Sequence, residues 1–333
     1  MPDASTGDAR LDQLRAWLAR QGLGDAVLTP ASSDASFRRY FRFHGPEGRR
    51  VVMDAPPEHE DCRPFVHVAG LLREAGLNAP RILAQDLDNG FLLLTDLGDA
   101  TYLDVLGSDN AEQLMPAALD ALVRWQAATR PGELPPYDAA LLERELRLFP
   151  DWYLARHLCV TPTAAEAATM ERLFQGLVKR ALAQPRVWVH RDYMPRNLMP
   201  GGETPGILDF QDAVEGPPSY DVICLIRDAF ISWPLDTEQR WLRYYHERAL
   251  AAGIAVPYSV EAFWSDCTWM GVQRHLKVMG IFARIRYRDG KPRYLEDAPR
   301  FRDYLLRAAA DEPELAPLVD LVEAWHMRAA ARE

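Results

Sequence analysis

Two short polar segments, each following an apolar run, contain the residues of this chain that are best suited to chemistry. Val187-Trp-Val189 leads into His190-Arg-Asp192-Tyr-Met-Pro-Arg-Asn197, and Gly206-Ile-Leu208 leads into Asp209. Phosphoryl transfer needs one carboxylate to orient or deprotonate the acceptor hydroxyl, and an amide and a second carboxylate to hold magnesium. We therefore predict that Asp192 is the catalytic base and that Asn197 and Asp209 bind the metal. Two protein oxygens suffice, because Mg²⁺ usually keeps several waters and also binds the phosphates.

The two segments together are more informative than either one alone. A His-x-Asp sequence recurs by chance, and a carboxylate at a strand end can simply cap a loop. Here an asparagine follows five residues after Asp192, and a second apolar run then ends in Asp209. An ionised Asp209 in that position is costly without a cation beside it. The combination favours a metal-dependent site over a chance match.

Composition limits the class of protein and its partners. The 333 residues are long enough for a sizeable core and two lobes. A formal net charge of −10 disfavours nucleic acid or an anionic membrane as the main partner. The four cysteines are far apart in the sequence, which favours reduced thiols in a cytoplasm over a disulfide frame or a zinc site. No apolar run is long enough to span a membrane, and the N-terminus has no apolar signal region. We expect a cytoplasmic monomer.

Periodicity predicts an α+β fold with an N-terminal lobe over residues 1–95. Apolar residues at helical spacing predict a first helix around Leu11–Leu18 and a second over Cys62–Glu74. Short apolar or aromatic runs, punctuated by proline and glycine, predict five strands. The strands are expected at Ala26–Leu28, Phe37–Phe43, Val51–Met53, Arg81–Gln85 and Phe91–Leu94.

The pattern changes after Thr95, and the rest of the chain is predicted to be mainly helical. Residues 96–100 are assigned to a hinge and 101–333 to a C-terminal lobe for catalysis and substrate binding. Helices are expected at Met115–Thr129, Ala139–His157, Ala164–Ala183, Ser219–Ile231, Asp236–Ala252, Ser259–Arg286, Arg300–Ala310 and Leu315–Arg328. The two short strands among them lead into the segments with Asp192 and Asp209.

The chain resembles the aminoglycoside/choline-kinase-like phosphotransferases, which share the two-lobed protein-kinase fold. The resemblance rests on His190–Asn197, on Leu208-Asp-Phe-Gln-Asp-Ala213 and on Tyr220-Asp221. Four further segments are similar to bacterial anomeric kinases of N-acetylmuramic acid and N-acetylglucosamine. They are Ser33–Tyr40, Val52–Pro57, Leu94–Asp99 and Gln273–Gly280. The resemblance implies an ATP- and Mg²⁺-dependent kinase of a small-molecule sugar, acting in cell-wall recycling.

The resemblance also implies residues that bind the nucleotide. Thr95, Asp96 and Leu97 occupy the hinge, whose backbone pairs with adenine in kinases. Ser33 and Ser36 lie in Ala31–Ser36, which replaces the glycine-rich turn over the phosphates. Strand Val51–Asp54 lacks the lysine that kinases use on the phosphates, and Phe65-Val-His67 lacks its glutamate partner. The segment Phe37–Arg42 offers replacement cations: Arg38 and Arg42 share one strand face, and Arg39, which we expect in the site, lies on the other.

Further residues are assigned to the acceptor sugar or to support of the catalytic loop. Gln211 and Asp212 can bind a sugar hydroxyl or cap the following turn. Arg196, Gln273, Arg274 and Lys277 are candidates for sugar binding, and a lactyl carboxylate on the sugar would favour one of the cations. His190 and Asp221 are expected to hold the catalytic loop by hydrogen bonding. Since Gln211 replaces the glycine usual after Asp-Phe, we expect no activation switch of the protein-kinase type.

Two other functions stay open at this point. The acidic composition also permits a kinase of a cationic or other small hydroxyl substrate, such as an aminoglycoside or choline. The missing lysine favours a nucleotide-binding pseudokinase scaffold, whereas the complete set Asp192, Asn197 and Asp209 argues against one.

Overall fold

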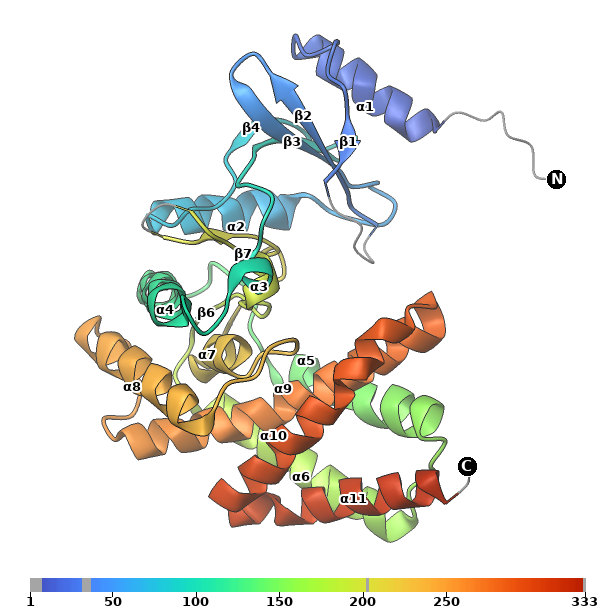
Figure 1. Ribbon diagram of the computed structural model, residues 1–333, viewed down its shortest axis with the longest axis vertical. Helices are drawn as coiled ribbons and strands as arrows, with labels where there is room; N and C mark the ends of the chain where they lie inside the picture. The colour runs from blue at the N-terminus through green and yellow to red at the C-terminus, as the bar shows by residue number, and fades with distance from the viewer. Residues whose placement is uncertain (1–7, 32–36, 202–203, 332–333) are drawn as a thin grey trace, which may run out of the picture. The chain divides into compact units, whose positions relative to one another are not determined.

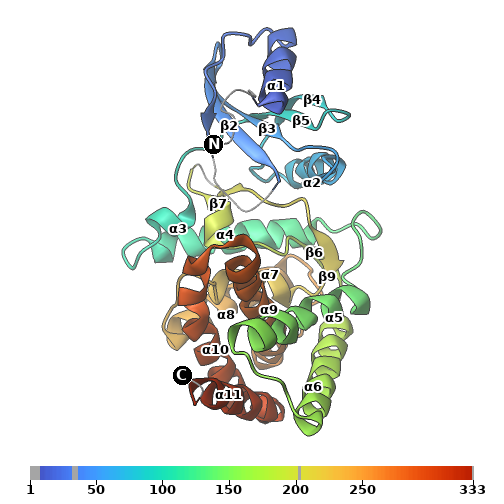
Figure 2. The same ribbon diagram turned by 90° about the vertical axis from the view of Figure 1, so that its right-hand side faces the viewer.

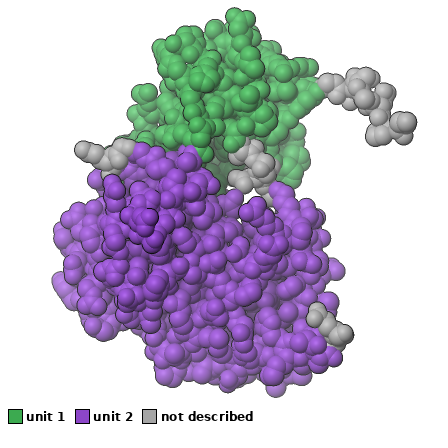
Figure 3. All heavy atoms as spheres, in the orientation of Figure 1, with its two compact units in different colours: residues 1–99, 206–211 green, residues 100–205, 212–333 purple. Residues whose placement is uncertain are grey.

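The computed structural model describes residues 8–31, 37–201 and 204–331 and divides into two compact units. Unit 1 contains Met1–Asp99 together with Gly206–Gln211, and unit 2 contains Ala100–Pro205 together with Asp212–Glu333 (Figure 3). Unit 1 is built around a sheet, and unit 2 is built mainly from helices.

Unit 1 is a five-stranded antiparallel sheet with two helices (Figure 1). The strand order is β1-β2-β3-β5-β4, and the register pairs neighbouring strands antiparallel throughout. The bounds are α1 Ala9–Arg20, β1 Thr29–Pro30, β2 Arg39–Gly45, β3 Gly48–Asp54, α2 Arg63–Glu74, β4 Ile82–Asp86 and β5 Phe91–Thr95. The predicted sheet with one inserted helix is confirmed, although the first strand lies at Thr29–Pro30 rather than Ala26–Leu28.

The two faces of this sheet carry different chemistry because strand side chains alternate. Helix α1 buries Leu14, Trp17 and Leu18 against Phe43, Val52, Phe91 and Leu93. The register opposes Arg39 to Asp54 and Phe41 to Val52, so Arg39 and Asp54 lie on the α1 face. Tyr40 and Met53 are the pair between them and lie on the opposite face.

The segment Gly206–Gln211 belongs to unit 1 although it is distant in sequence. In β8, Gly206–Ile207, the Ile207 N–H donates to the Asn78 carbonyl at 2.8 Å. Phe210 packs against Phe65 of α2, with ring centroids 4.7 Å apart. The sequence-based division places this segment in the C-terminal lobe, 101–333, because neither contact is visible in local periodicity.

Unit 2 is mainly helical, with α9 at its centre (Figure 2). Helix α9 contacts α5, α6, α7 and α10. The helices are α3 Tyr102–Val105, α4 Ala111–Ala127, α5 Ala139–Leu148, α6 Ala164–Ala183, α7 Ser219–Ile226, α8 Leu235–Ala251, α9 Val260–Asp289, α10 Ala298–Asp311 and α11 Ala316–Ala330. Short strands lie at β6 Val187–Val189, β7 Leu198–Met199 and β9 Val214–Gly216. In the described part of the chain, no helix is both long and apolar enough to cross a bilayer.

Helix α5 is followed directly by a segment of different helical geometry. The predicted helix Ala139–His157 changes at Phe149 into a π-helical segment, Phe149–His157, whose second residue is Pro150. Proline has no N–H for the hydrogen-bond pattern of an α-helix, which accounts for the change.

Helix α9 crosses the end of α5 at very short range. A Cβ placed on Gly280 would lie 2.3 Å from the Leu148 carbonyl carbon, so only glycine fits at this crossing.

Candidate active site

The loop with Asp192 begins at the end of β6, which pairs antiparallel with β9. Asp221, at the start of α7, is fully buried, and its side chain binds backbone N–H groups of this loop. Its carboxylate accepts hydrogen bonds from the His190 N–H at 2.6 Å and the Arg191 N–H at 2.9 Å. Burial raises the pKa of Asp221 to about 7, although the two N–H bonds act in the opposite direction. These are contacts of the supporting kind that was expected of Asp221.

The backbone of the loop is strained where it turns. Arg191 has a φ of 74°, a left-handed conformation that non-glycine residues rarely adopt. The buried His190 ring accepts a hydrogen bond on Nδ1 from the Asp192 N–H at 3.3 Å, and it packs edge-on against Tyr193. Strain of this kind persists where surrounding contacts fix the backbone, and it concentrates at functional sites. Asp192 thus stands on a loop fixed from two sides.

Asn197 lies on a short 3₁₀ turn, Pro195–Asn197, and is tied back to the loop. Its amide Nδ2 donates to the Asp192 carbonyl at 2.9 Å, and its own N–H donates to the Met194 carbonyl at 2.8 Å. Because the amide nitrogen is used in this bond, the side-chain oxygen is the atom oriented for a ligand. An amide oxygen is a suitable donor for a hard cation such as Mg²⁺.

A buried ionic cluster anchors Arg191 within unit 2. The Glu145 carboxylate of α5 lies 2.5 Å from Arg191 Nη2 and 2.9 Å from Lys277 Nζ. It also accepts hydrogen bonds from Gln273 Nε2, at 3.2 Å, and from the Tyr137 hydroxyl. Burial opposes ionisation of Glu145, but Lys277 and Arg191 outweigh it and lower the pKa to about 2. The cluster links the residue before Asp192 to both α5 and α9.

Three residues expected to bind sugar are thus engaged inside unit 2. Gln273 and Lys277 donate to Glu145, and Arg274 donates to the Arg227 carbonyl at 3.3 Å. All three are buried. The structure therefore differs from the expectation of direct sugar contact and gives these side chains internal partners. Sequence analysis missed Glu145, although its place between Leu142 and Leu146 on the buried stripe of α5 is a signal of a paired charge.

The remaining candidates for sugar binding in unit 2 lie near the ends of the catalytic loop. The Arg196 guanidinium lies over the Phe230 ring, 5.2 Å from its centroid, in a cation–π contact. The Asp212 carbonyl accepts a hydrogen bond from Arg191 Nη1 at 3.2 Å, so its backbone is tied to the same loop. Their contact with a sugar stays a prediction.

Asp209 lies in unit 1, at the end of the strand-like segment from Gly206. Its φ is 60°, so it shares the left-handed backbone conformation of Arg191. Its carboxylate accepts a hydrogen bond from Gln211 Nε2 at 3.0 Å, and 47% of the side chain is exposed. Gln211 therefore orients Asp209 in this structure. The exposed carboxylate is a suitable oxygen ligand for Mg²⁺.

Arg38, not Arg39, is the arginine that faces Asp209. Arg38 Nη2 lies 4.0 Å from Asp209 Oδ1, and Arg38 Nε lies 4.0 Å from Glu60 Oε2. Arg39 instead pairs with the fully buried Asp54, at 2.5 Å, on the α1 face. The expectation that Arg39 faces the site is therefore not met, because a shift of one residue along a strand reverses the face.

The predicted hinge residues are partly occupied by other contacts. The Asp96 carboxylate accepts hydrogen bonds from Arg42 Nε at 2.7 Å and Arg49 Nε at 2.9 Å, so its side chain is already neutralised. The Thr95 hydroxyl accepts a hydrogen bond from the Arg81 N–H at 2.9 Å. Adenine pairing by the backbone of Thr95, Asp96 and Leu97 stays a prediction. Ser33 and Ser36 lie outside the described residues.

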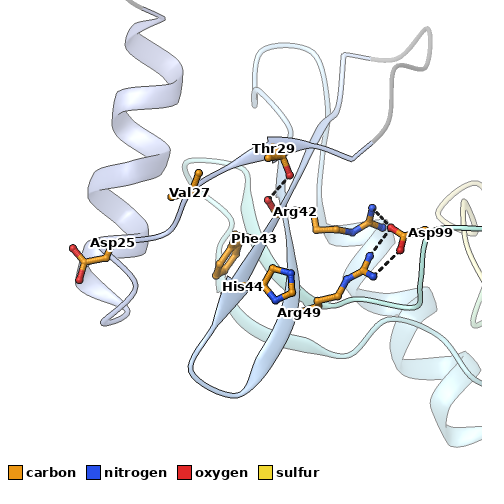
Figure 4. Close-up of a pocket in the computed structure, with 8 residues that line it drawn as sticks. All are labelled: Asp25, Val27, Thr29, Arg42, Phe43, His44, Arg49 and Asp99. Carbon is orange, nitrogen blue, oxygen red and sulfur yellow. Dashed lines mark hydrogen bonds and ion pairs between the residues drawn. The ribbon is translucent and has the colours of Figure 1, made fainter.

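Arg42 and Arg49 also border a pocket in unit 1 (Figure 4). They point from β2 and β3 toward Asp99, with Arg42 Nη1 at 2.7 Å from Asp99 Oδ1 and Arg49 Nη1 at 2.6 Å from Oδ2. The pocket is lined by Asp25, Val27, Thr29, Arg42, Phe43, His44, Arg49 and Asp99. Both of its arginines are thus paired with carboxylates, and it carries no excess of positive charge for phosphates.

The chain is similar to known proteins in both sequence and fold. Residues 27–257 match the model of the phosphotransferase enzyme family. The chain is 58% identical over 326 residues to the N-acetylmuramate/N-acetylglucosamine kinase of Pseudomonas aeruginosa, covering 95% of this chain and 96% of that protein. It is 53% identical to the protein of the same name from Pseudomonas putida, covering 98% of both. Among solved structures, the ethanolamine kinase of Plasmodium vivax has a TM-score of 0.66 at 9% identity, covering 94% of this chain and 93% of that one, which supports the protein-kinase-like fold.

Proposed function

Since the chain belongs to the phosphotransferase enzyme family, we propose that it is an ATP-dependent sugar kinase that phosphorylates the anomeric hydroxyl of N-acetylmuramate, N-acetylglucosamine or both. The observation that carries this proposal is the identity of 58% over nearly the whole chain to a kinase named for these two sugars. The reaction class fits the two segments with Asp192, Asn197 and Asp209. A role in cell-wall recycling is part of the proposal.

Asp192 is the group proposed to act on the acceptor. Its carboxylate would accept the proton of the sugar hydroxyl, whose oxygen attacks the γ-phosphorus while the bond to the β-phosphate oxygen breaks and ADP leaves. Such transfer depends mainly on positioning and electrostatic stabilisation. The bonds from Asp221 and Asn197 to the loop supply that positioning on the protein side.

Asn197 and Asp209 are the proposed magnesium ligands. Among the described residues, no group of three or more histidine, cysteine or acidic side chains could hold a metal by itself. Mg²⁺ typically binds through one or two protein oxygens together with phosphates and waters. When bound, the ion would neutralise charge on the transferring phosphoryl group. The assignment of each residue to the metal rests on the family resemblance.

The acceptor sugar is proposed to lie near the ends of the catalytic loop. Arg196 would pair with the lactyl carboxylate of N-acetylmuramate, and Gln211 and Asp212 would bind hydroxyls. A carboxylate-binding arginine would favour N-acetylmuramate over N-acetylglucosamine. Arg196→Ala is therefore expected to raise KM for N-acetylmuramate more than for N-acetylglucosamine.

The test is ATP consumption with N-acetylmuramate, N-acetylglucosamine, choline and kanamycin, each with and without Mg²⁺. Turnover of the two amino sugars is expected, and turnover of choline or kanamycin alone would reject the sugar assignment. Methyl glycosides of the same sugars block the anomeric hydroxyl and leave the others available. Phosphorylated methyl glycoside, detected by mass spectrometry, would reject anomeric transfer but leave the kinase assignment intact.

A further inference from the structure

A turn that is fixed by a buried aspartate follows helix α7, which ends at Ile226. Asp228 is fully buried, and its Oδ1 accepts hydrogen bonds from the Phe230 N–H at 2.8 Å and the Ile231 N–H at 3.1 Å. An aspartate that binds backbone N–H groups just ahead of it in the chain stabilises a turn. Phe230 is therefore presented on a fixed backbone.

Helix α10 holds the same turn from its other end. The Ser232 hydroxyl lies 3.1 Å from the Tyr304 hydroxyl and accepts a hydrogen bond from Arg300 Nη1 at 2.5 Å. Tyr304 is buried, and its hydroxyl also lies 3.5 Å from the Asp228 carbonyl. Both ends of the turn Asp228–Ser232 thus contact α10, so the position of Phe230 between them is set within unit 2.

The Phe230 ring meets the catalytic loop at Arg196. The Arg196 guanidinium lies over this ring, 5.2 Å from its centroid, in a cation–π contact. The ring itself packs against Phe282 of α9, with centroids 5.9 Å apart, and edge-on against Tyr294 at 6.4 Å. Phe230 is half-buried. These contacts make the ring a fixed surface against a long, flexible arginine side chain.

A fixed ring of this kind changes how well an arginine binds a ligand. A flexible side chain loses rotamer freedom when a ligand orders it, and a contact that orders it beforehand reduces this loss. A carboxylate is bound by the N–H donors of a guanidinium, whereas an aromatic ring attracts its charge. One guanidinium can therefore make both contacts, and the aromatic contact improves the other by pre-organisation.

We propose that Phe230 is a specificity-determining residue, which positions Arg196 for the lactyl carboxylate of N-acetylmuramate. Because the proposed function pairs Arg196 with that carboxylate, the role of Phe230 rests on that function. Phe230 acts through Arg196, so it is a positioning residue and not a catalytic one. N-acetylglucosamine has no lactyl carboxylate, and its binding should depend little on Phe230.

The test is steady-state kinetics with the two amino sugars. Phe230→Leu keeps an apolar side chain but removes the aromatic face. It is expected to raise KM for N-acetylmuramate roughly 3- to 10-fold relative to KM for N-acetylglucosamine. The values of kcat and of KM for ATP should stay near those of the wild type, because the effect is confined to holding Arg196. Phe230→Tyr keeps the ring and should restore the wild-type ratio of the two KM values.

Two further variants separate this role from a merely structural one. When Arg196 is already alanine, adding Phe230→Leu should not change the ratio of the two KM values any further, since the effect passes through Arg196. Phe301→Leu is the packing control, because the Phe301 ring packs against Phe282, with centroids 5.6 Å apart, in the same aromatic cluster. It should leave the ratio unchanged.

A selective rise in KM for N-acetylmuramate in Arg196→Ala, without one in Phe230→Leu, would overturn the role of Phe230 alone. An equal rise for both sugars in Phe230→Leu, or a Phe230→Tyr variant as impaired as Phe230→Leu, would also overturn it. So would a shift of the same size in Phe301→Leu. Loss of selectivity in neither Arg196→Ala nor Phe230→Leu would refute the Arg196 assignment as well. Wild-type turnover of the two sugars judges the kinase function separately.

Discussion

Replacing Glu145 by glutamine should destabilise unit 2 substantially although the change is nearly isosteric. The carboxylate compensates two buried cations, Arg191 and Lys277. Its pKa is lowered from an ordinary 4.5 to about 2. At 1.36 kcal/mol per pH unit, that difference corresponds to roughly 3 kcal/mol of stability. Removing one partner of a buried ion pair typically lowers the stability by a similar amount, about 3–5 kcal/mol.

The pH dependence of this contribution to the free energy of unfolding follows from the lowered pKa of Glu145. Because the folded state holds the carboxylate ionised, the stabilisation is fully present above pH 4.5 and is lost as pH falls toward about 2. Urea unfolding followed by circular dichroism should therefore show a gap of roughly 3 kcal/mol between wild type and Glu145→Gln at neutral pH, narrowing below pH 4.5.

Glu143→Gln is the matched control for this experiment. It is the same substitution on an exposed position of the same helix, α5, and should change the stability by less than about 0.5 kcal/mol. Equal stabilities for the two variants at neutral pH would refute the reasoning. A gap that widens on acidification would refute it as well.

The other predictions concern catalysis, metal and packing. Asp192→Asn should lower kcat roughly 10²- to 10⁴-fold with folding intact, and near-normal turnover would contradict its role as base. Asp209→Ala should abolish Mg²⁺-dependent turnover, and Asn197→Ala should reduce it less because an amide carries no charge; a Mg²⁺ titration that is the same for both variants would argue against this order. Gly280→Ala should destabilise by about 1–3 kcal/mol, because its Cβ would meet a backbone carbonyl, whereas Gly176→Ala in helix α6 meets only a side chain at 3.6 Å and should be neutral or stabilising in thermal unfolding.

The sequence by itself determined the elements and the chemistry of the predicted catalytic segments. Helix and strand periodicity depend on neighbours within about ten residues, so four of the five strands and the long helices were predictable, whereas the first strand lies at Thr29–Pro30 and not at Ala26–Leu28. The segment His190–Asn197 is equally local, because the loop ties itself together: His190 accepts from the Asp192 N–H, and Asn197 donates to the Asp192 carbonyl. Asp209 was recognisable for a similar reason, since it directly follows an apolar run.

Only the tertiary structure decided which charges pair. Arg38 and Arg39 are adjacent in sequence, yet one faces Asp209 and the other Asp54, because strand parity and the position of α1 assign opposite faces to them. The sequence suggests Gln273 and Lys277 as substrate-binding residues, but in the folded protein both contact Glu145 of α5. Partners separated by more than a hundred residues leave no local pattern. They pair because a buried charge without a partner is costly, and this cost arises only when the helices pack.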